Sequence, residues 1–171
     1  MGETYILLED GPNGDAKAFA NPEGLICAWN SDDVANAFDE MECARASGKW
    51  LAGFASYELG YALEPKLANL MPENRQSPLI CFGVFDGPDV SAKKNLMNKA
   101  LSEKDNAKLE DPKPVWSEAE YTVPFNVLAE YISSGDFYQT NLTFSLTSKY
   151  QGTALGLYAA LRSVQPVSYG G

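Results

Sequence analysis

Carboxylates are the residues of this chain best suited to acid–base chemistry, because its 171 residues include no histidine. Without histidine, a Ser-His-Asp triad, an imidazole base and the common histidine metal sites are excluded for this chain. Glu9 with Asp10 and Glu58 with Glu64 are paired acids that could act as general acid and base. Since Asp and Glu side chains are mostly exposed in proteins, we favour their interpretation as solvated surface acids.

Cysteine is the other reactive residue type in this chain. Cys27, Cys43 and Cys81 are odd in number, widely spaced and set among apolar neighbours. This pattern is typical of reduced core cysteines in a cytosolic protein, and we assign them no disulfide or metal role.

The charge of the chain limits its partners. With 13 Lys and Arg against 23 Asp and Glu, the formal net charge is -10. Such a surface repels phosphate backbones and anionic membranes, so we expect no nucleic-acid partner. The amino-terminal sequence shows no basic segment followed by an apolar one, and no apolar run reaches about 18 residues. We therefore expect a cytoplasmic location and no membrane partner.

Four apolar runs predict the strands that must position the carboxylates and cysteines. They are residues 5–8, 25–29, 50–57 and 79–85. The last two runs are apolar or small on both alternating faces, which predicts interior strands covered on both sides. Residues 102–116 are charged and proline-containing, which indicates a connecting segment between two parts of one domain.

Capping residues predict one helix between the second and third apolar runs and another near residue 160. Ser31 can cap the first, which carries acids in its first turn and ends before Gly48. Thr153 can cap the last, which ends before Pro166.

A middle helix could begin at either of two residues. Ser117 and Glu120 have capping-box spacing, but a start there would place Pro124 deep in the helix, where its ring clashes with the preceding turn. We therefore predict Thr122 as the cap and Gly135 as the end. This helix should expose Asn126 and Glu130 and bury Val127, Leu128, Tyr131 and Ile132.

Residues 138–147 alternate strictly between apolar and hydrogen-bonding side chains, as expected of a strand. We interpret the polar face as solvated or bonded to a neighbouring strand rather than as catalytic. The residues by themselves thus predict a mixed domain of helices and strands.

The run YISSGDFYQTNLT at residues 131–143 closely resembles the YI-x-x-GD-hydrophobic-YQ-x-NL segment of chorismate-utilising enzymes. Residues 50–60 resemble the family's G-x-x-SYE-x-G strand, residues 7–10 its LLES motif and residues 161–169 its LR-x-x-NPSPY motif. The resemblance covers nearly the whole chain. Within the family, component I of aminodeoxychorismate synthase is most similar, with component I of anthranilate synthase second.

The resemblance implies an α+β fold, with mainly antiparallel sheets and flanking helices, in which residues 1–171 form the amino-terminal portion of a longer enzyme. The catalytic half would then lie beyond this chain, which would hold neither catalytic groups nor metal ligands and would be inactive alone. The intact enzyme would use Mg²⁺, aminate chorismate and take ammonia from a glutamine amidotransferase subunit. A free-standing amino-acid-binding or interaction module is the alternative from another class. Bare sheet edges and apolar faces would favour self-association.

The family's tryptophan pocket is the one ligand site that the resemblance places in this chain. Its LLES and NPSPY motifs correspond here to Asp10, Ser168, Tyr169 and Gly170. Asp10 stands where the motif has a serine and adds charge near a ligand carboxylate, and Ser168 stands where it has a proline.

Overall fold

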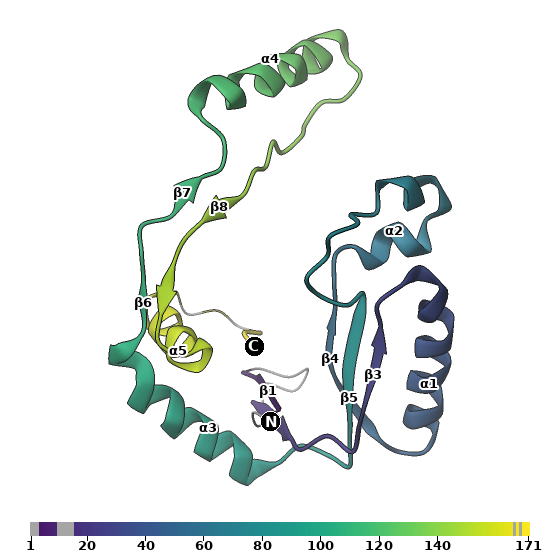
Figure 1. Cartoon of the computed structure of the whole chain (residues 1–171), viewed down its shortest axis with the longest axis vertical. Helices are drawn as coiled ribbons and strands as arrows, with labels where there is room; N and C mark the ends of the chain where they lie inside the picture. The colour runs from purple at the N-terminus through teal and green to yellow at the C-terminus, as the bar shows by residue number, and fades with distance from the viewer. Residues whose placement is uncertain (1–3, 10–15, 166, 168) are drawn as a thin grey trace. The chain divides into compact units, whose positions relative to one another are not determined.

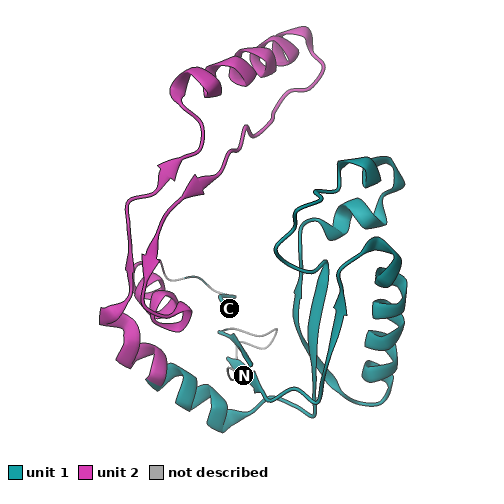
Figure 2. Ribbon diagram, viewed as in Figure 1, with its two compact units in different colours: residues 1–98, 166–171 teal, residues 99–165 magenta. Residues whose placement is uncertain are grey.

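The computed structural model describes residues 4–9, 16–165, 167 and 169–171 (Figure 1). Contacts within the chain divide it into two compact units (Figure 2). Unit 1 comprises residues 1–98 and 166–171, and unit 2 comprises residues 99–165. Each unit is described by itself below.

Unit 1 is built on antiparallel strands. β1 (Tyr5–Leu8) pairs with β2 (Lys17–Ala20). β3 (Gly24–Ala28), β4 (Trp50–Ala55) and β5 (Ile80–Phe85) form a second sheet in the order β3-β5-β4. All four strands predicted from apolar runs are confirmed, and β2 is an additional one.

Helix α1 (Val34–Ala46) covers one face of the three-stranded sheet. The core between them consists of Ile26, Ala28, Val34, Ala37, Leu59, Leu79 and Ile80. A 3-10 turn, Ser31–Asp33, precedes the helix, and Asn30 rather than the predicted Ser31 caps that turn. Gly48 follows with a φ of 80°, so the predicted glycine stop is confirmed.

The opposite sheet face is covered in part by the β1–β2 hairpin. Phe19 packs with Ala52 and Phe85, and the Phe19 and Phe85 ring centroids are 5.2 Å apart. β5 is the central strand, as predicted, whereas the prediction of an interior position for β4 is wrong. β4 pairs only with β5 among the described residues, and its Trp50 and Phe54 side chains are about half exposed.

Three helical segments complete unit 1 and lead out of it. They are α2 (Leu59–Leu63), the 3-10 segment η2 (Pro65–Leu70) and α3 (Val90–Glu103). The boundary between the units falls within α3, between residues 98 and 99.

Unit 2 contains two short antiparallel ladders. The predicted connector, residues 102–116, contributes one strand to each. The ladders pair β6 (Lys108–Leu109) with β9 (Tyr150–Gln151) and β7 (Lys113–Pro114) with β8 (Leu146–Thr147). A 3-10 turn, η3 (Lys104–Asn106), precedes them, and α5 (Ala154–Val164) follows them. Thr153 caps α5 as predicted, because its hydroxyl accepts a hydrogen bond from the Gly156 amide at 3.0 Å.

Helix α4 (Glu118–Ser134) is capped by Ser117, so the prediction of Thr122 as its cap is wrong. The Glu120 carboxylate accepts from the Ser117 amide at 2.8 Å, and the Ser117 hydroxyl accepts from the Glu120 amide. This capping box satisfies two free amides and outweighs the hydrogen bond that Pro124 removes within the helix. The predicted burial on α4 is also wrong, because no residue of this helix is buried.

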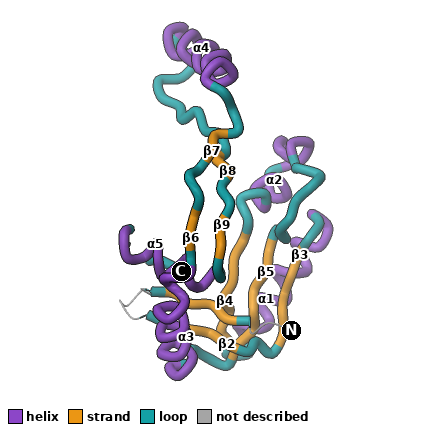
Figure 3. Tube along the Cα trace, turned by 60° about the vertical axis from the view of Figure 1, so that its left-hand side comes forward, coloured by secondary structure: helices purple, strands orange, loops and turns teal. Residues whose placement is uncertain are grey.

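The predicted strand at residues 138–147 is realised only at its end. Residues 138–145 run as a loop between α4 and β8 (Figure 3), and only Leu146–Thr147 joins a ladder. A strand requires a partner of matching length, and β7 offers two residues. The helices and antiparallel strands together confirm the α+β class. No helix within the described ranges has the length and apolar character needed to cross a bilayer.

Candidate functional site

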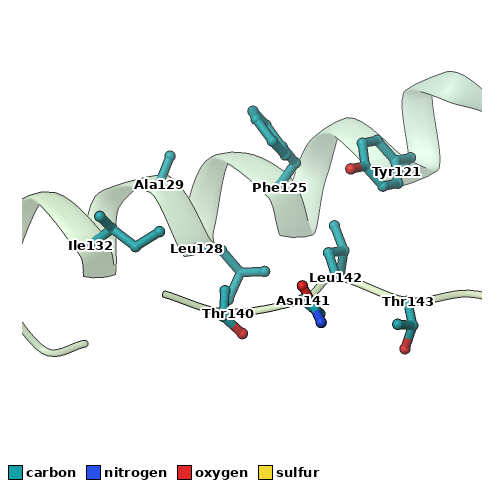
Figure 4. Close-up of a pocket in the computed structure, with 9 residues that line it drawn as sticks. All are labelled: Tyr121, Phe125, Leu128, Ala129, Ile132, Thr140, Asn141, Leu142 and Thr143. Atoms are coloured by element: carbon teal, nitrogen blue, oxygen red, sulfur yellow. The ribbon is translucent and has the colours of Figure 1, made fainter. Parts of the chain in front are cut away.

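The segment that carries the longest sequence motif lies along helix α4 and encloses a cavity of about 420 Å³ with it (Figure 4). One helix face and four consecutive loop residues line this α4 cavity. The lining residues are Tyr121, Phe125, Leu128, Ala129, Ile132, Thr140, Asn141, Leu142 and Thr143. Five of them belong to the motif run at residues 131–143.

The turn after α4 brings the motif segment back along the helix. Gly135 takes a left-handed conformation with a φ of 83°, which a residue with a Cβ adopts only at a cost. The amides of Gly135 and Asp136 donate to the carbonyls of Ile132 and Tyr131 at 3.2 and 3.0 Å. The Gly-Asp step of the motif is therefore the helix stop, as the sequence predicts.

Aromatic rings pack at the amino-terminal end of the α4 cavity. Tyr121 lies 5.8 Å from Phe125 and 5.6 Å from Phe144, measured between ring centroids. Phe144 stacks in turn on Trp116 at 5.5 Å. These contacts join the helix to the end of the motif segment and favour the longer α4 that starts at Ser117.

The α4 cavity is lined by uncharged groups. Leu128 and Leu142 point into the space between helix and loop, whereas Thr143 points away from the helix (Figure 4). The polar groups along the loop are the two threonine hydroxyls and the Asn141 amide. None of these loop groups titrates near neutral pH, so they can form hydrogen bonds but cannot act as a general acid or base.

The electrostatics of α4 act at its amino terminus rather than at the cavity. Hydrogen bonds from the Ser117 amide and then from its hydroxyl hold the pKa of Glu120 below its ordinary value. A carboxylate at this position also complements the positive end of the helix dipole. The role of Glu120 is thus to define where α4 begins.

The predicted tryptophan pocket falls partly within the described residues. Asp10 and Ser168 lie outside them. Gly170 lies beside the LLES-like segment, because its carbonyl accepts a hydrogen bond from the Glu9 amide at 2.7 Å. Tyr169 has a φ of 73° and a side chain that is 80% exposed. The structure thus brings the two predicted motifs together through their backbones.

Of the carboxylate pairs, the structure describes Glu58 and Glu64, and it describes Glu9 but not Asp10. Glu64 is exposed and caps η2, where its carboxylate accepts from the Lys66 amide at 3.3 Å. Glu58 lies at the amino-terminal cap position of α2. For Glu64 the interpretation as a surface acid is confirmed.

Two of the three cysteines are more accessible than predicted. Cys27 and Cys43 are exposed, and Cys81 is intermediate. Alternation explains Cys27, because its neighbours Ile26 and Ala28 face the core below α1. The prediction of core positions is wrong for Cys27 and Cys43.

Magnesium needs several oxygen ligands in one place. Over residues 4–9, 16–165, 167 and 169–171, no three His, Cys, Asp or Glu side chains come together as a metal-binding group. The residues described here therefore do not fit the metal implied by the resemblance.

Sequence reasoning missed one residue, Tyr121, on the helix side of the α4 cavity. A start at Thr122 leaves Tyr121 outside the helix, whereas the true start places Tyr121, Phe125 and Ala129 one turn apart on a single face. The signal that finds this face is the capping-box spacing of Ser117 and Glu120.

The fold and this site define an α+β protein with an uncharged cavity between one helix and the motif loop. The family model described as chorismate binding enzyme matches residues 3–171. The chain therefore belongs to the family of chorismate-binding enzymes. No curated protein and no solved structure matches it.

Proposed function

We propose that this chain is the scaffold portion of an aminodeoxychorismate synthase component I, which aminates chorismate to 4-amino-4-deoxychorismate. The observation that carries the proposal is the family match over residues 3–171, together with the motif run that lines the α4 cavity. The choice of this synthase within the family is supported by the similarity of residues 48–54 and 62–65 to component I.

The lining of the α4 cavity supports a structural rather than a catalytic role. Chorismate carries two carboxylates, and a protein binds such a dianion with cations or aligned donors. No Lys or Arg lines this cavity. We propose that the groups that bind chorismate and Mg²⁺ are supplied by further polypeptide and that a glutamine amidotransferase subunit supplies ammonia.

Product analysis tests this assignment. This chain, incubated with chorismate, ammonia and Mg²⁺, should release no product, while the product of the complete reading frame should form 4-amino-4-deoxychorismate. Release of anthranilate with pyruvate would assign the protein to anthranilate synthase component I instead. Turnover by residues 1–171 alone would refute the scaffold role.

A matched pair of variants tests the α4 cavity within the complete protein. Asn141→Leu keeps the volume of a lining residue but removes its amide, whereas Asn126→Leu makes the same change on α4 outside the lining. Because a displaced scaffold loop also displaces the groups that it supports, we expect Asn141→Leu to lower kcat/KM roughly tenfold or more and Asn126→Leu to leave it unchanged. Equal effects of the two changes would argue against a role for the motif loop.

Amino-acid binding is a second candidate, favoured by the hydrogen bond between Glu9 and Gly170. A side chain at residue 170 would meet Val167 Cγ2 at 3.2 Å and the Glu9 carboxyl at 3.5 Å, whereas one at Gly24 would meet nothing within 4 Å. Calorimetry should therefore show tryptophan binding that Gly170→Val abolishes and Gly24→Val retains. Absence of heat with the unaltered chain would remove this candidate.

A further inference from the structure

Two of the three cysteines lie directly opposite each other on neighbouring antiparallel strands. Cys27 is on β3 and Cys81 is on the central strand β5, and the two are register partners. Their Sγ atoms are 3.1 Å apart, with the Cys27 thiol donating to the Cys81 sulfur. Both residues are free thiols.

Strand pairing holds the Cα atoms of the two residues at a separation that is compatible with a disulfide bond. Residues opposite each other in an antiparallel ladder have Cα atoms about 4.5–5.5 Å apart. A disulfide accepts Cα separations of about 4.4–6.8 Å, so the backbone pairing of β3 with β5 can persist after the bond forms.

The two thiols differ in accessibility. Cys27 lies on an edge strand of its sheet and is exposed, whereas Cys81 lies between Cys27 and Phe54 in the row that crosses the three strands. Burial, and then the hydrogen bond with Cys27, raise the pKa of Cys81 to about 11. A dissolved oxidant therefore meets Cys27 first.

We propose that Cys27 and Cys81 form a redox modification site, in which a peroxide converts the pair to an intramolecular disulfide that joins β3 to β5. The Cys27 thiolate attacks one peroxide oxygen, the O–O bond breaks, and a sulfenic acid and hydroxide result. The Cys81 sulfur then attacks the Cys27 sulfur, and the S–O bond breaks. The first hydroxide takes up the proton that Cys27 lost, and the departing hydroxide takes the Cys81 proton, so two thiols and one peroxide give one disulfide and two waters.

Metal binding is a poorer use of the same pair. Structural zinc sites take four ligands, and the described ranges contain no third His, Cys, Asp or Glu that completes a group with these two thiols. Oxidation requires only the two sulfurs that are already in contact.

Hydrogen peroxide treatment of the whole chain, followed by thiol counting and peptide mapping, tests the proposal. The unaltered chain should fall from three free thiols to one, with Cys27 and Cys81 in one cross-linked peptide pair that dithiothreitol separates. Cys43→Ser is the matched control, because Cys43 is exposed on α1, and it should still form the bond. Cys27→Ser and Cys81→Ser should each form no intramolecular disulfide.

Three results would overturn the proposal: a cross-link to Cys43, disulfide-linked dimers in place of the internal bond, or irreversible oxidation of Cys27 while Cys81 stays reduced. Mapping of the unaltered chain decides among them without any variant. A serine variant that does not fold therefore leaves the test intact.

Discussion

Glycine at residue 53 should be essential for the three-stranded sheet, and the structure allows the cost of replacing it to be worked out. A Cβ at Gly53 would lie 2.6 Å from the Phe82 Cα and closer still to the carbonyl oxygen of Cys81. Both atoms belong to the backbone of β5, which cannot turn aside as a side chain can. Gly53→Ala must therefore push β4 away from its only described partner strand.

The expected loss follows from what that displacement breaks. Overpacking alone costs about 1–3 kcal/mol, and each ladder hydrogen bond that lengthens costs about 1 kcal/mol more. With two such bonds lost, Gly53→Ala should lower the free energy of unfolding by about 3–5 kcal/mol. That is a large share of the roughly 5–15 kcal/mol that stabilises a typical domain.

Urea denaturation followed by far-ultraviolet circular dichroism measures this loss as a fall in midpoint. Gly60→Ala is the matched control, because its Cβ would meet nothing within 4 Å and Gly60 lies in helix α2. Alanine there should be neutral or stabilise the chain by up to about 1 kcal/mol. If Gly53→Ala unfolds within about 0.5 kcal/mol of the unaltered protein, the strand-contact reasoning is wrong.

Three further predictions concern pH, oxidation and association. The pKa of Glu120 lies below its ordinary value of 4.5. The stabilisation of α4 by this carboxylate is therefore present above pH 4.5 and is lost as the pH falls through the lowered pKa. Glu120→Gln should lose less helix than the unaltered chain in an acid titration followed by circular dichroism. The proposed disulfide between Cys27 and Cys81 would close a loop between residues 54 apart and should raise the free energy of unfolding by up to about 4 kcal/mol, measured by urea titration of the peroxide-treated chain with and without reductant. Because α4 buries none of its apolar residues, light scattering should show a mass that rises with concentration, and a constant monomer mass would contradict this.

The sequence predicts those elements whose signals are local. Gly48 and Gly135 end their helices as expected, because a left-handed stop depends on the glycine itself. Thr153 caps α5 for a similarly local reason, since its hydroxyl reaches an amide three residues ahead. The four predicted strands of unit 1 also form.

Predictions that depend on distant partners are less successful. Residues 138–145 have the alternation of a strand, but β7 provides a ladder partner only for Leu146–Thr147. β4 has the composition of an interior strand yet lies beside β5 alone in the described chain. The composition of a strand indicates which surfaces its side chains can pack against. Its pairing depends on which other strands the fold places beside it.

The α4 start shows how two local rules can conflict. Pro124 argues against a helix through it, and the Ser117–Glu120 box argues for one. The sequence alone does not show which rule prevails. The contacts that favour the start at Ser117 include the ring of Phe144, which packs on Tyr121 from the far end of the motif loop. The sequence therefore predicts the helix that lines the cavity except for Tyr121, and it predicts a strand where residues 140–143 form the loop side.

The division of the chain has a consequence for its synthesis on the ribosome. Unit 2 interrupts unit 1, which resumes only after residue 165. The ladders of unit 2 pair residues that emerge within one stretch, so they can form during translation. The bond from the Glu9 amide to the Gly170 carbonyl has to wait until residue 170 has been made, after all of unit 2. The segment that follows β1 thus acquires this neighbour only after the whole of unit 2 has been made.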